Sequence, residues 1–261
     1  MARPPGPAPL HRGDNVGNIS VEHFEDGVSL FTITRAQRRN AISAQTAIDL
    51  QEAFAEFDAS PRRRVAVITG AGNEAFSAGA DIDSMPELWR CLPGLGIATH
   101  KPIIAAVSGW CVGGGLVMTM MSDLAVAAEN ARFSYPEGRL GLTQGMIAGL
   151  AGRIPHKAAM EIILLGKPMS AQRAYHVGLV NELAPDGQHV QAALEMARHL
   201  ATLAPMVLRT LKKFVGQVVP SGPSESFVRV NRELQAIAQS DDYAEGVAAF
   251  REKRAPVFAD R

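Results

Sequence analysis

The chain has 261 residues, 47% of them hydrophobic, and its 26 basic residues balance its 26 acidic ones. This balance excludes the overall positive charge that draws proteins to nucleic acids or to anionic membranes. No uninterrupted apolar run reaches the roughly 18 to 20 residues that span a bilayer, and no secretory signal pattern opens the chain. Because Cys91 and Cys111 are the only cysteines and no metal-ligand cluster accompanies them, we expect a cytoplasmic protein without a metal.

The first third of the chain predicts a leader, a hairpin and a helix. Residues 1–15 are rich in Pro, Gly and Arg without an apolar period, which predicts a disordered leader. Residues 16–34 alternate apolar and polar side chains around the turn Glu25-Asp26-Gly27, which predicts strands near 18–23 and 28–34. Ser43, followed by apolar residues at helical spacing from Ala47 to Phe57, predicts an N-capped helix.

The rest of the chain divides into an α/β part and a helical part. Short apolar runs at 64–69, 103–107 and 124–127 predict buried strands, and an apolar helix begins at Leu116. Strands separated by helices indicate a parallel sheet. From about residue 191 the pattern is helical only, at 193–198, 206–215, 225–239 and 243–253. The sequence therefore predicts an α/β core over residues 16–190 and a helical region over residues 191–261.

Two loops of small residues are the candidates for chemistry, Phe76-Ser-Ala-Gly-Ala-Asp81 and Gly113-Gly-Gly115. Small side chains let a ligand approach main-chain N–H groups, and a helix N-terminus adds free donors. Two such donors facing one another would stabilise a carbonyl oxygen as it becomes an enolate. The alternative is that the glycines allow a helix to pack closely on a strand. A dinucleotide site is disfavoured, because the spacing is not that of a G-x-G-x-x-G motif.

A series of motifs along residues 16–258 resembles the crotonase family of enoyl-CoA hydratases and isomerases. The motifs are Asn40-Ala-Ile, Val67-Ile-Thr-Gly, Phe76-Ser-Ala-Gly-Ala-Asp-Ile, Lys101-Pro-Ile-Ile-Ala-Ala-Val-Ser-Gly, Gly113-Gly-Gly, Ser122-Asp-Leu-Ala-Val-Ala-Ala-Glu-Asn-Ala-Arg-Phe, Pro136-Glu, Leu140-Gly-Leu, Gly178-Leu-Val-Asn and Glu245-Gly to Phe258. They follow one another in the family's order. The resemblance implies a spiral of ββα units, an acyl-CoA thioester substrate, and homotrimers or hexamers assembled partly by the C-terminal helices. It implies no cofactor, since coenzyme A is part of the substrate.

The resemblance also implies roles for individual residues. The N–H groups of Ala80 and Gly114 would form the oxyanion hole, and Glu137 would be the catalytic acid and base. Coenzyme A would lie near Arg38, Arg39 and Ala78, and near Phe250 and Lys253 of the same or a neighbouring subunit. The remaining residues expected to contact the substrate are Asp81, Ile82, Val117 and Leu142. Asp81 is also expected to cap a helix.

One residue departs from the hydratase pattern. Hydratases of the family use two glutamates, one just after the glycine run and one in the Pro-Glu pair, and here Val117 stands in the first position. An isopropyl group neither accepts nor donates a proton, whereas the single Glu137 can still move a proton between carbon atoms. The resemblance to isomerases with an apolar residue at this position therefore predicts Δ3,Δ2-enoyl-CoA isomerisation.

Three alternatives accompany this prediction. The first is a hydratase with altered water activation, in which Thr143, Gln144 or Asp83 places the water. The second is an acyl-CoA-binding protein with little turnover, because the oxyanion hole and the coenzyme A site could outlast the chemistry. The third is a serine hydrolase built on the same fold. Against this last alternative, the chain has no G-x-S-x-G motif, and no spacing identifies a histidine partner for Ser77.

Overall fold

The computed structural model describes residues 14–259, with side chains from residue 17 onward. Most of the predicted leader, residues 1–13, lies outside the described residues. For the last two residues of the leader, Asp14 and Asn15, the prediction of disorder is wrong. They belong to strand β1 (Asp14–Val16), which pairs antiparallel with β2 (Ile19–His23). The strand is held by main-chain hydrogen bonds to β2, which do not depend on apolar side chains. The segment therefore forms a strand although its low apolar content did not predict one.

Eleven strands and nine α-helices make up the described residues, together with three short 3₁₀ helices. The other strands are β3 (Val28–Ile33), β4 (Val65–Gly70), β5 (Ala75–Ser77), β6 (Ile103–Val107), β7 (Trp110–Val112), β8 (Leu124–Ala128), β9 (Arg132–Ser134), β10 (Met169–Ser170) and β11 (Glu182–Ala184). The helices are α1 (Ala44–Ala59), α2 (Gly114–Met121), α3 (Glu137–Leu140), α4 (His156–Leu165), α5 (Ala171–His176), α6 (His189–Thr202), α7 (Pro205–Val218), α8 (Pro223–Ala238) and α9 (Asp241–Glu252). The 3₁₀ helices are η1 (Ala36–Arg38), η2 (Leu88–Cys91) and η3 (Met146–Gly152).

The strands form two sheets, and from β4 to β9 successive strands alternate between them. The larger sheet has the order β1-β2-β3-β4-β6-β8-β11 and the smaller one β10-β9-β7-β5. The pairs β4–β5, β6–β7 and β8–β9 each place one strand in either sheet, and a helical segment follows each pair. This repeat is the predicted spiral of ββα units, with parallel pairing from β3 through β4, β6 and β8 to β11. The predicted hairpin and parallel strands are confirmed, whereas the sequence analysis missed the smaller sheet.

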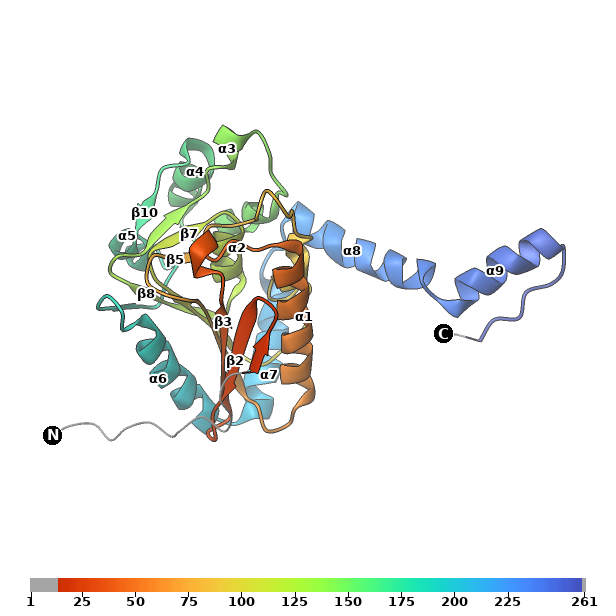
Figure 1. Ribbon diagram of the computed structural model, residues 1–261, viewed down its shortest axis with the longest axis horizontal. Coiled ribbons are helices and arrows are strands. Elements are labelled where there is room, and N and C mark those ends of the chain that lie inside the picture. Colours follow the sequence, from red (N-terminus) through yellow and green to blue (C-terminus); the bar gives the residue numbers. More distant parts are fainter. Residues whose placement is uncertain (1–13, 260–261) are drawn as a thin grey trace.

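Alternate residues of the larger sheet face two separate hydrophobic cores. Val65 and Val67 of β4 belong to the core beneath α6, whereas Ala66 and Ile68 belong to the core that includes the apolar face of α1. This alternation follows from the two-residue period of a strand. Figure 1 shows α1 and α6 on opposite sides of the sheet. Ser43 caps α1 as predicted, because its side chain accepts a hydrogen bond from the Thr46 N–H group.

The four predicted C-terminal helices are confirmed as α6, α7, α8 and α9. The first of them, α6, packs on the sheet of its own chain through Ala193, Leu194 and Ala197. By contrast, α8 and α9 extend away from the rest of the chain, as Figure 1 shows. Within the described residues, no helix combines the length and the apolar character that crossing a membrane would need.

Candidate active site

The two loops of small residues lie against one another. A Cβ atom on Gly79 would lie 2.9 Å from the Val112 carbonyl oxygen and 3.3 Å from the Gly114 nitrogen. Gly79 has a φ of +89°, which also favours glycine. Gly115 instead allows close packing of a helix on a strand, the alternative explanation for the glycines, since a Cβ atom there would lie 2.9 Å from the Ser77 Cβ atom of β5. The glycines therefore serve both purposes: some keep space at the loops and Gly115 permits close packing of α2.

The main-chain N–H groups of Ala80 and Gly114 have no hydrogen-bond acceptor within residues 14–259. Ile42 pairs with Ala80 in a parallel bridge, in which its N–H group donates to the Gly79 carbonyl and its carbonyl accepts from Asp81. In such a bridge the N–H group of the central residue, Ala80, points away from the partner strand. Gly114 is the first residue of α2, where N–H groups have no acceptor inside the helix. Two free donors are thus present in two adjoining loops.

The Glu137 carboxylate lies beside the same loops. A Cβ atom on Gly113 would lie 2.6 Å from Glu137 Oε1 and 3.8 Å from the Gly79 Cα atom. Glu137 Oε2 is buried and has no hydrogen-bond partner in the described part of the chain. Burial raises the pKa of Glu137 to about 7, because its charged form loses hydration. The Pro136-Glu pair therefore supplies a half-buried carboxyl group that can change its protonation state near neutral pH.

Val117 offers no polar group to this site. Its side chain is 1% exposed and belongs to the main hydrophobic core, and its N–H group donates to the Gly113 carbonyl. Leu142 follows α3 and is 39% exposed, and its N–H group reaches the Glu137 carbonyl at 3.4 Å. The site therefore combines apolar side chains with one carboxyl group.

Tyr135 is a neighbour of Glu137 that the sequence analysis missed. Its hydroxyl group lies 2.8 Å from Thr143 Oγ1, which also accepts a hydrogen bond from the Gly145 N–H group. Burial raises the pKa of Tyr135, and the nearby negative charge of Glu137 contributes to the shift. The signal available in the sequence was the position of Tyr135, two residues before the catalytic candidate. The hydroxyl pair fixes the loop after α3 to the strand segment before it.

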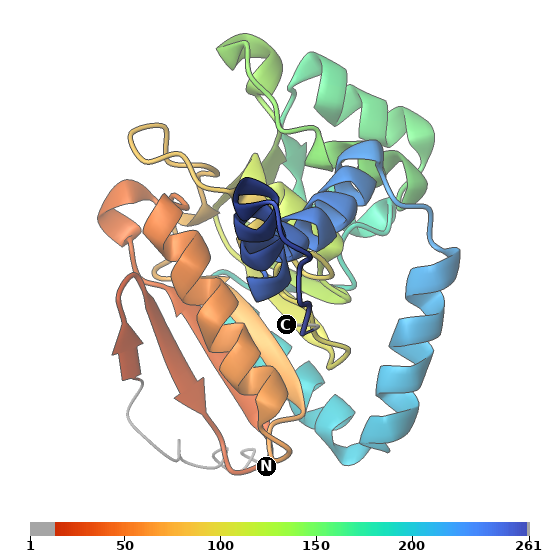
Figure 2. The same ribbon diagram turned by 90° about the vertical axis from the view of Figure 1, so that its right-hand side faces the viewer.

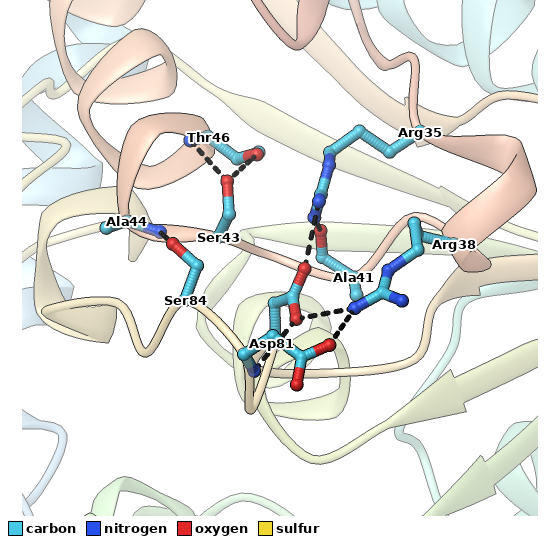
Figure 3. A network of polar contacts seen from close by, with 9 residues as sticks. Arg35, Arg38, Ala41, Ser43, Ala44, Thr46, Asp81 and Ser84 are labelled. Atoms are coloured by element: carbon cyan, nitrogen blue, oxygen red, sulfur yellow. Dashed lines mark hydrogen bonds and ion pairs between the residues drawn. The ribbon is translucent and has the colours of Figure 1, made fainter.

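Asp81 holds the loop that carries Ala80, and the prediction that it caps a helix is wrong. Its side chain is 3% exposed and accepts hydrogen bonds from Arg35 at 2.9 Å and from Arg38 at 3.1 Å (Figure 3). The Arg35 guanidinium holds the pKa of Asp81 below its ordinary value, although burial opposes this shift. Arg35 also donates to the Ala41 carbonyl at 2.5 Å, so it ties the loop to the residues before α1. No sequence pattern singled out Arg35, because its partner is 46 residues away.

A surface hollow of about 300 Å³ adjoins this network and is called the Arg38 hollow below. It gathers Arg38, Arg39, Ala78, Ala80, Asp81 and Ile82, all of them residues that the resemblance assigned to binding of the acyl-CoA substrate, with Gln37 and Ala41. Arg39 has a left-handed backbone with a φ of 50°, and its carbonyl accepts from the Ala78 N–H group. The Arg38 side chain binds Asp81 and Asp83.

Two predicted contacts do not lie in the same chain's site. Phe250 is 86% exposed, and α9, which carries it and ends just before Lys253, lies far from α3 in Figure 1. If they contact a substrate, the contact has to come from another subunit, which was one of the two expectations.

The other side chains considered for chemistry, Ser77 and the two cysteines, are buried in the fold. Ser77 is fully buried, and its Oγ accepts a hydrogen bond from the Gly79 N–H group. Cys91 and Cys111 are free and buried, and burial raises the pKa of each to about 12. Over residues 14–259, no cluster of His, Cys, Asp and Glu side chains could hold a metal ion.

Comparison with known proteins gives one family. Residues 23–261 match the family described as Enoyl-CoA hydratase/isomerase. The carnitinyl-CoA dehydratase of Escherichia coli O157:H7 is 33% identical over 256 residues, which cover 92% of this chain and 98% of that protein. The carnitinyl-CoA dehydratase of Salmonella typhi is 34% identical over 240 residues, covering 86% of this chain and 92% of that protein.

Solved structures agree with this result. The carnitinyl-CoA hydratase of Mycobacterium avium superposes with a TM-score of 0.72 at 34% identity, covering 95% of this chain and 100% of that one. The enoyl-CoA hydratase of Mycobacterium tuberculosis H37Rv has a TM-score of 0.72 at 31% identity, covering 94% and 99%. With its two-sheet spiral, its adjoining loops of small residues and its Pro-Glu carboxylate, this chain belongs to the enoyl-CoA hydratase/isomerase family, the crotonases.

Proposed function

We propose that the protein moves the double bond of a 3-enoyl-CoA thioester to the C2 position, with Glu137 as its single acid and base. The observation that carries the proposal is the half-buried Glu137 carboxyl group, whose Oε2 has no hydrogen-bond partner in the described residues, beside the free N–H groups of Ala80 and Gly114. Val117 supports isomerisation over hydration, because it leaves the position of the first hydratase glutamate apolar.

The proposed reaction needs one proton transfer in each direction. The Ala80 and Gly114 N–H groups bind the thioester carbonyl oxygen, and the Glu137 carboxylate removes a proton from C2. The electron pair of the broken C–H bond moves to the oxygen, and both donors stabilise the resulting dienolate. Glu137 then returns the proton to C4, which leaves the double bond between C2 and C3. A pKa of about 7 suits this cycle, because the group has to lose and regain a proton at neutral pH.

The acyl-CoA substrate is part of the proposal. The Arg38 hollow adjoins Ala80 and offers two arginine side chains, which suit the phosphate groups of coenzyme A. The family and the printed names of the relatives, which act on CoA thioesters, support the same class of substrate. In this proposal the chain uses no separate cofactor.

A second candidate is hydration or dehydration, which the names of the relatives favour. The Tyr135 and Thr143 hydroxyl groups form a pair next to Glu137 and could place a water molecule in the absence of a second carboxylate. Of the other residues considered for this task, Asp83 binds Arg38 at 2.5 Å, and Gln144 donates to the Pro86 carbonyl at 3.4 Å.

Two substrates separate the candidates. Purified protein is incubated with 3-enoyl-CoA and, separately, with crotonyl-CoA, and the 2-enoyl and 3-hydroxyacyl products are separated by chromatography. The proposal expects 2-enoyl-CoA from the first substrate and little hydration of the second. Hydration at a comparable or higher rate would favour the second candidate. Binding of both thioesters without either product would leave an acyl-CoA-binding protein.

Glycine substitutions test whether the loops and Glu137 form one site. Gly113→Ala is expected to lower the rate of double-bond migration at least tenfold, because the new methyl group would displace the Glu137 carboxylate and φ is +52° there. Gly138→Ala is the matched control, since no heavy atom lies within 4 Å of its Cβ position apart from its chain neighbours and the backbone of its own helix. Steady-state rates of both variants decide the matter: equal rates would separate Glu137 from the glycine loop.

The protruding C-terminal helices lead us to propose a homotrimer or hexamer. Phe227, Val230, Leu234 and Ile237 lie along one face of α8, and each is more than half exposed. A neighbouring copy that covers this face could also receive Phe250 and Lys253 at its Arg38 hollow. We expect a trimeric or hexameric mass by light scattering, and a smaller mass for Leu234→Glu combined with Ile237→Glu. Ala236→Glu, on the opposite face, should keep the original mass, and a monomeric unmodified protein would refute the assembly.

A further inference from the structure

A small hollow away from the candidate active site gathers four cationic side chains. Its volume is about 180 Å³, and none of its lining residues is acidic. The cations are Arg63, Arg64, Lys101 and Arg209. The other lining residues are apolar: Pro61, Val65, Pro102, Leu200, Leu203, Pro205 and Leu208. We call this place the cationic hollow.

The cationic hollow and Glu137 lie at opposite ends of the strands of the larger sheet. Arg63 and Arg64 lead into β4, Lys101 leads into β6, and these two strands run parallel. The hollow therefore lies at the amino ends of these strands, whereas the oxyanion loops lie beyond their carboxyl ends. The end of α6 and the start of α7 close it. Figures 1 and 2 show the α6–α7 connection at the bottom of the molecule and α3 at the top.

Two of the four cationic side chains already have hydrogen-bond acceptors among the described residues, and the other two do not. Lys101 is 4% exposed, and its Nζ donates to the carbonyls of Phe57, Asp58 and Ser60 at 2.7, 2.9 and 2.8 Å. Arg64 donates to the Ala201 carbonyl at 2.9 Å. By contrast, the guanidinium groups of Arg63 and Arg209 have neither a hydrogen bond nor an ion pair with any residue from 14 to 259.

The like charges are close enough to act on one another. Burial lowers the pKa of Lys101, and the positive charges of Arg209 and Arg63 lower it further, while Asp58 opposes this effect. The Asp58 carboxylate itself binds the Thr99 hydroxyl group. The cluster therefore repels itself in the folded chain, and an anion placed among the cations would relieve that repulsion.

We propose that the cationic hollow binds a small polyvalent oxyanion, such as phosphate or a short di- or tricarboxylate, through the guanidinium groups of Arg63 and Arg209. A guanidinium group presents a planar fork of donors that matches two oxygens of such an anion. The apolar walls strengthen these bonds by excluding water. The N-terminus of α7, which has no side-chain cap, adds a partial positive charge.

Thermal unfolding tests the proposal with phosphate and citrate as probes. Each is titrated against sodium chloride at equal ionic strength, because salt alone weakens repulsion between the cations. We expect the unfolding temperature to rise saturably with at least one probe, since a ligand that binds only the folded state stabilises it. The probe with the larger shift identifies phosphate-like or carboxylate chemistry. Phosphorus NMR line broadening measures phosphate binding directly.

Three variants locate the effect. Arg63→Gln with Arg209→Gln is expected to weaken binding about tenfold or more, because both unpartnered guanidinium groups are lost. Arg209→Gln alone, at an exposed position, gives a weaker loss and serves if the double variant does not fold. Arg62→Gln is the matched control, since this exposed neighbour does not line the hollow. A response no larger than that to chloride, an equal response in all three variants, or a response abolished by Arg38→Ala would overturn the proposal.

Discussion

Glu137→Gln is expected to lower the rate of double-bond migration by roughly 10³-fold, because the site then has no group that can accept a proton. An amide keeps the size and hydrogen-bonding capacity of the carboxyl group but does not titrate. The rate of 2-enoyl-CoA formation from 3-enoyl-CoA is the measurement. For the unmodified protein, kcat/KM should rise with pH and level off above about 7, since Glu137 has to be ionised to remove the C2 proton.

Stability measurements control for misfolding of Glu137→Gln. The folded protein holds the Glu137 proton up to about pH 7, whereas the unfolded chain releases it near the ordinary value of 4.5. The unfolded state thus binds fewer protons between these values, and the unmodified protein loses stability as pH rises through this window. At pH 8 the variant should therefore be more stable than the unmodified protein, by about 1–3 kcal/mol. A stable variant that still migrates the double bond would show that another group is the base.

Asp81→Ala is expected to lower the free energy of unfolding by about 3 kcal/mol, because it leaves the mostly buried Arg35 guanidinium without its carboxylate. The rate of double-bond migration should fall as well, since Asp81 fixes the loop that carries the Ala80 N–H group. Urea unfolding measures the first effect and steady-state kinetics the second. The pKa of Asp81 is lowered in the folded protein, so its contribution is present above the ordinary value of 3.8 and is lost as pH falls through the lowered pKa.

Asp83→Ala is the matched control for Asp81. Its side chain is 71% exposed and, among the residues that the structure describes, forms an ion pair only with Arg38, which is itself 48% exposed. Exposed ion pairs contribute little, so this change should cost less than about 1 kcal/mol. Equal losses in the two variants would mean that burial of the Asp81–Arg35 pair does not decide the stability of the loop.

The sequence predicted those elements whose residues follow a clear period. The hairpin, the strands that became β4, β6 and β8, the capped helix α1 and the C-terminal helices all carry such a signal. The strands β5, β7 and β9 have three residues each, too few for a period to be read, and they exist because the second sheet pairs them. Helix α6 has the pattern of an amphipathic helix, but the pattern does not say which surface its apolar face covers.

The same division applies to the site. The glycine loops and the Pro-Glu pair were found from short motifs, and the replacement of the first hydratase glutamate by Val117 was visible in the sequence alone. The contacts of Arg35 with Asp81 and of Tyr135 with Thr143 were not predicted, because a single polar residue gives no sign of its partner. The expected helix cap at Asp81 was wrong for this reason: a nearby arginine pair satisfied the carboxylate instead of a helix N-terminus.

By itself, the sequence determined which chemical groups are available: one carboxyl group after Pro136, a valine at position 117 and main-chain donors in two glycine-containing loops. It did so because these properties belong to single residues and their immediate neighbours. Only the tertiary structure decided that Glu137 lies beside Gly113 and loses its hydration there, that two guanidinium groups hold Asp81, and that four cations meet at the far edge of the sheet. These features depend on burial and on distances between residues far apart in the chain, which folding alone creates.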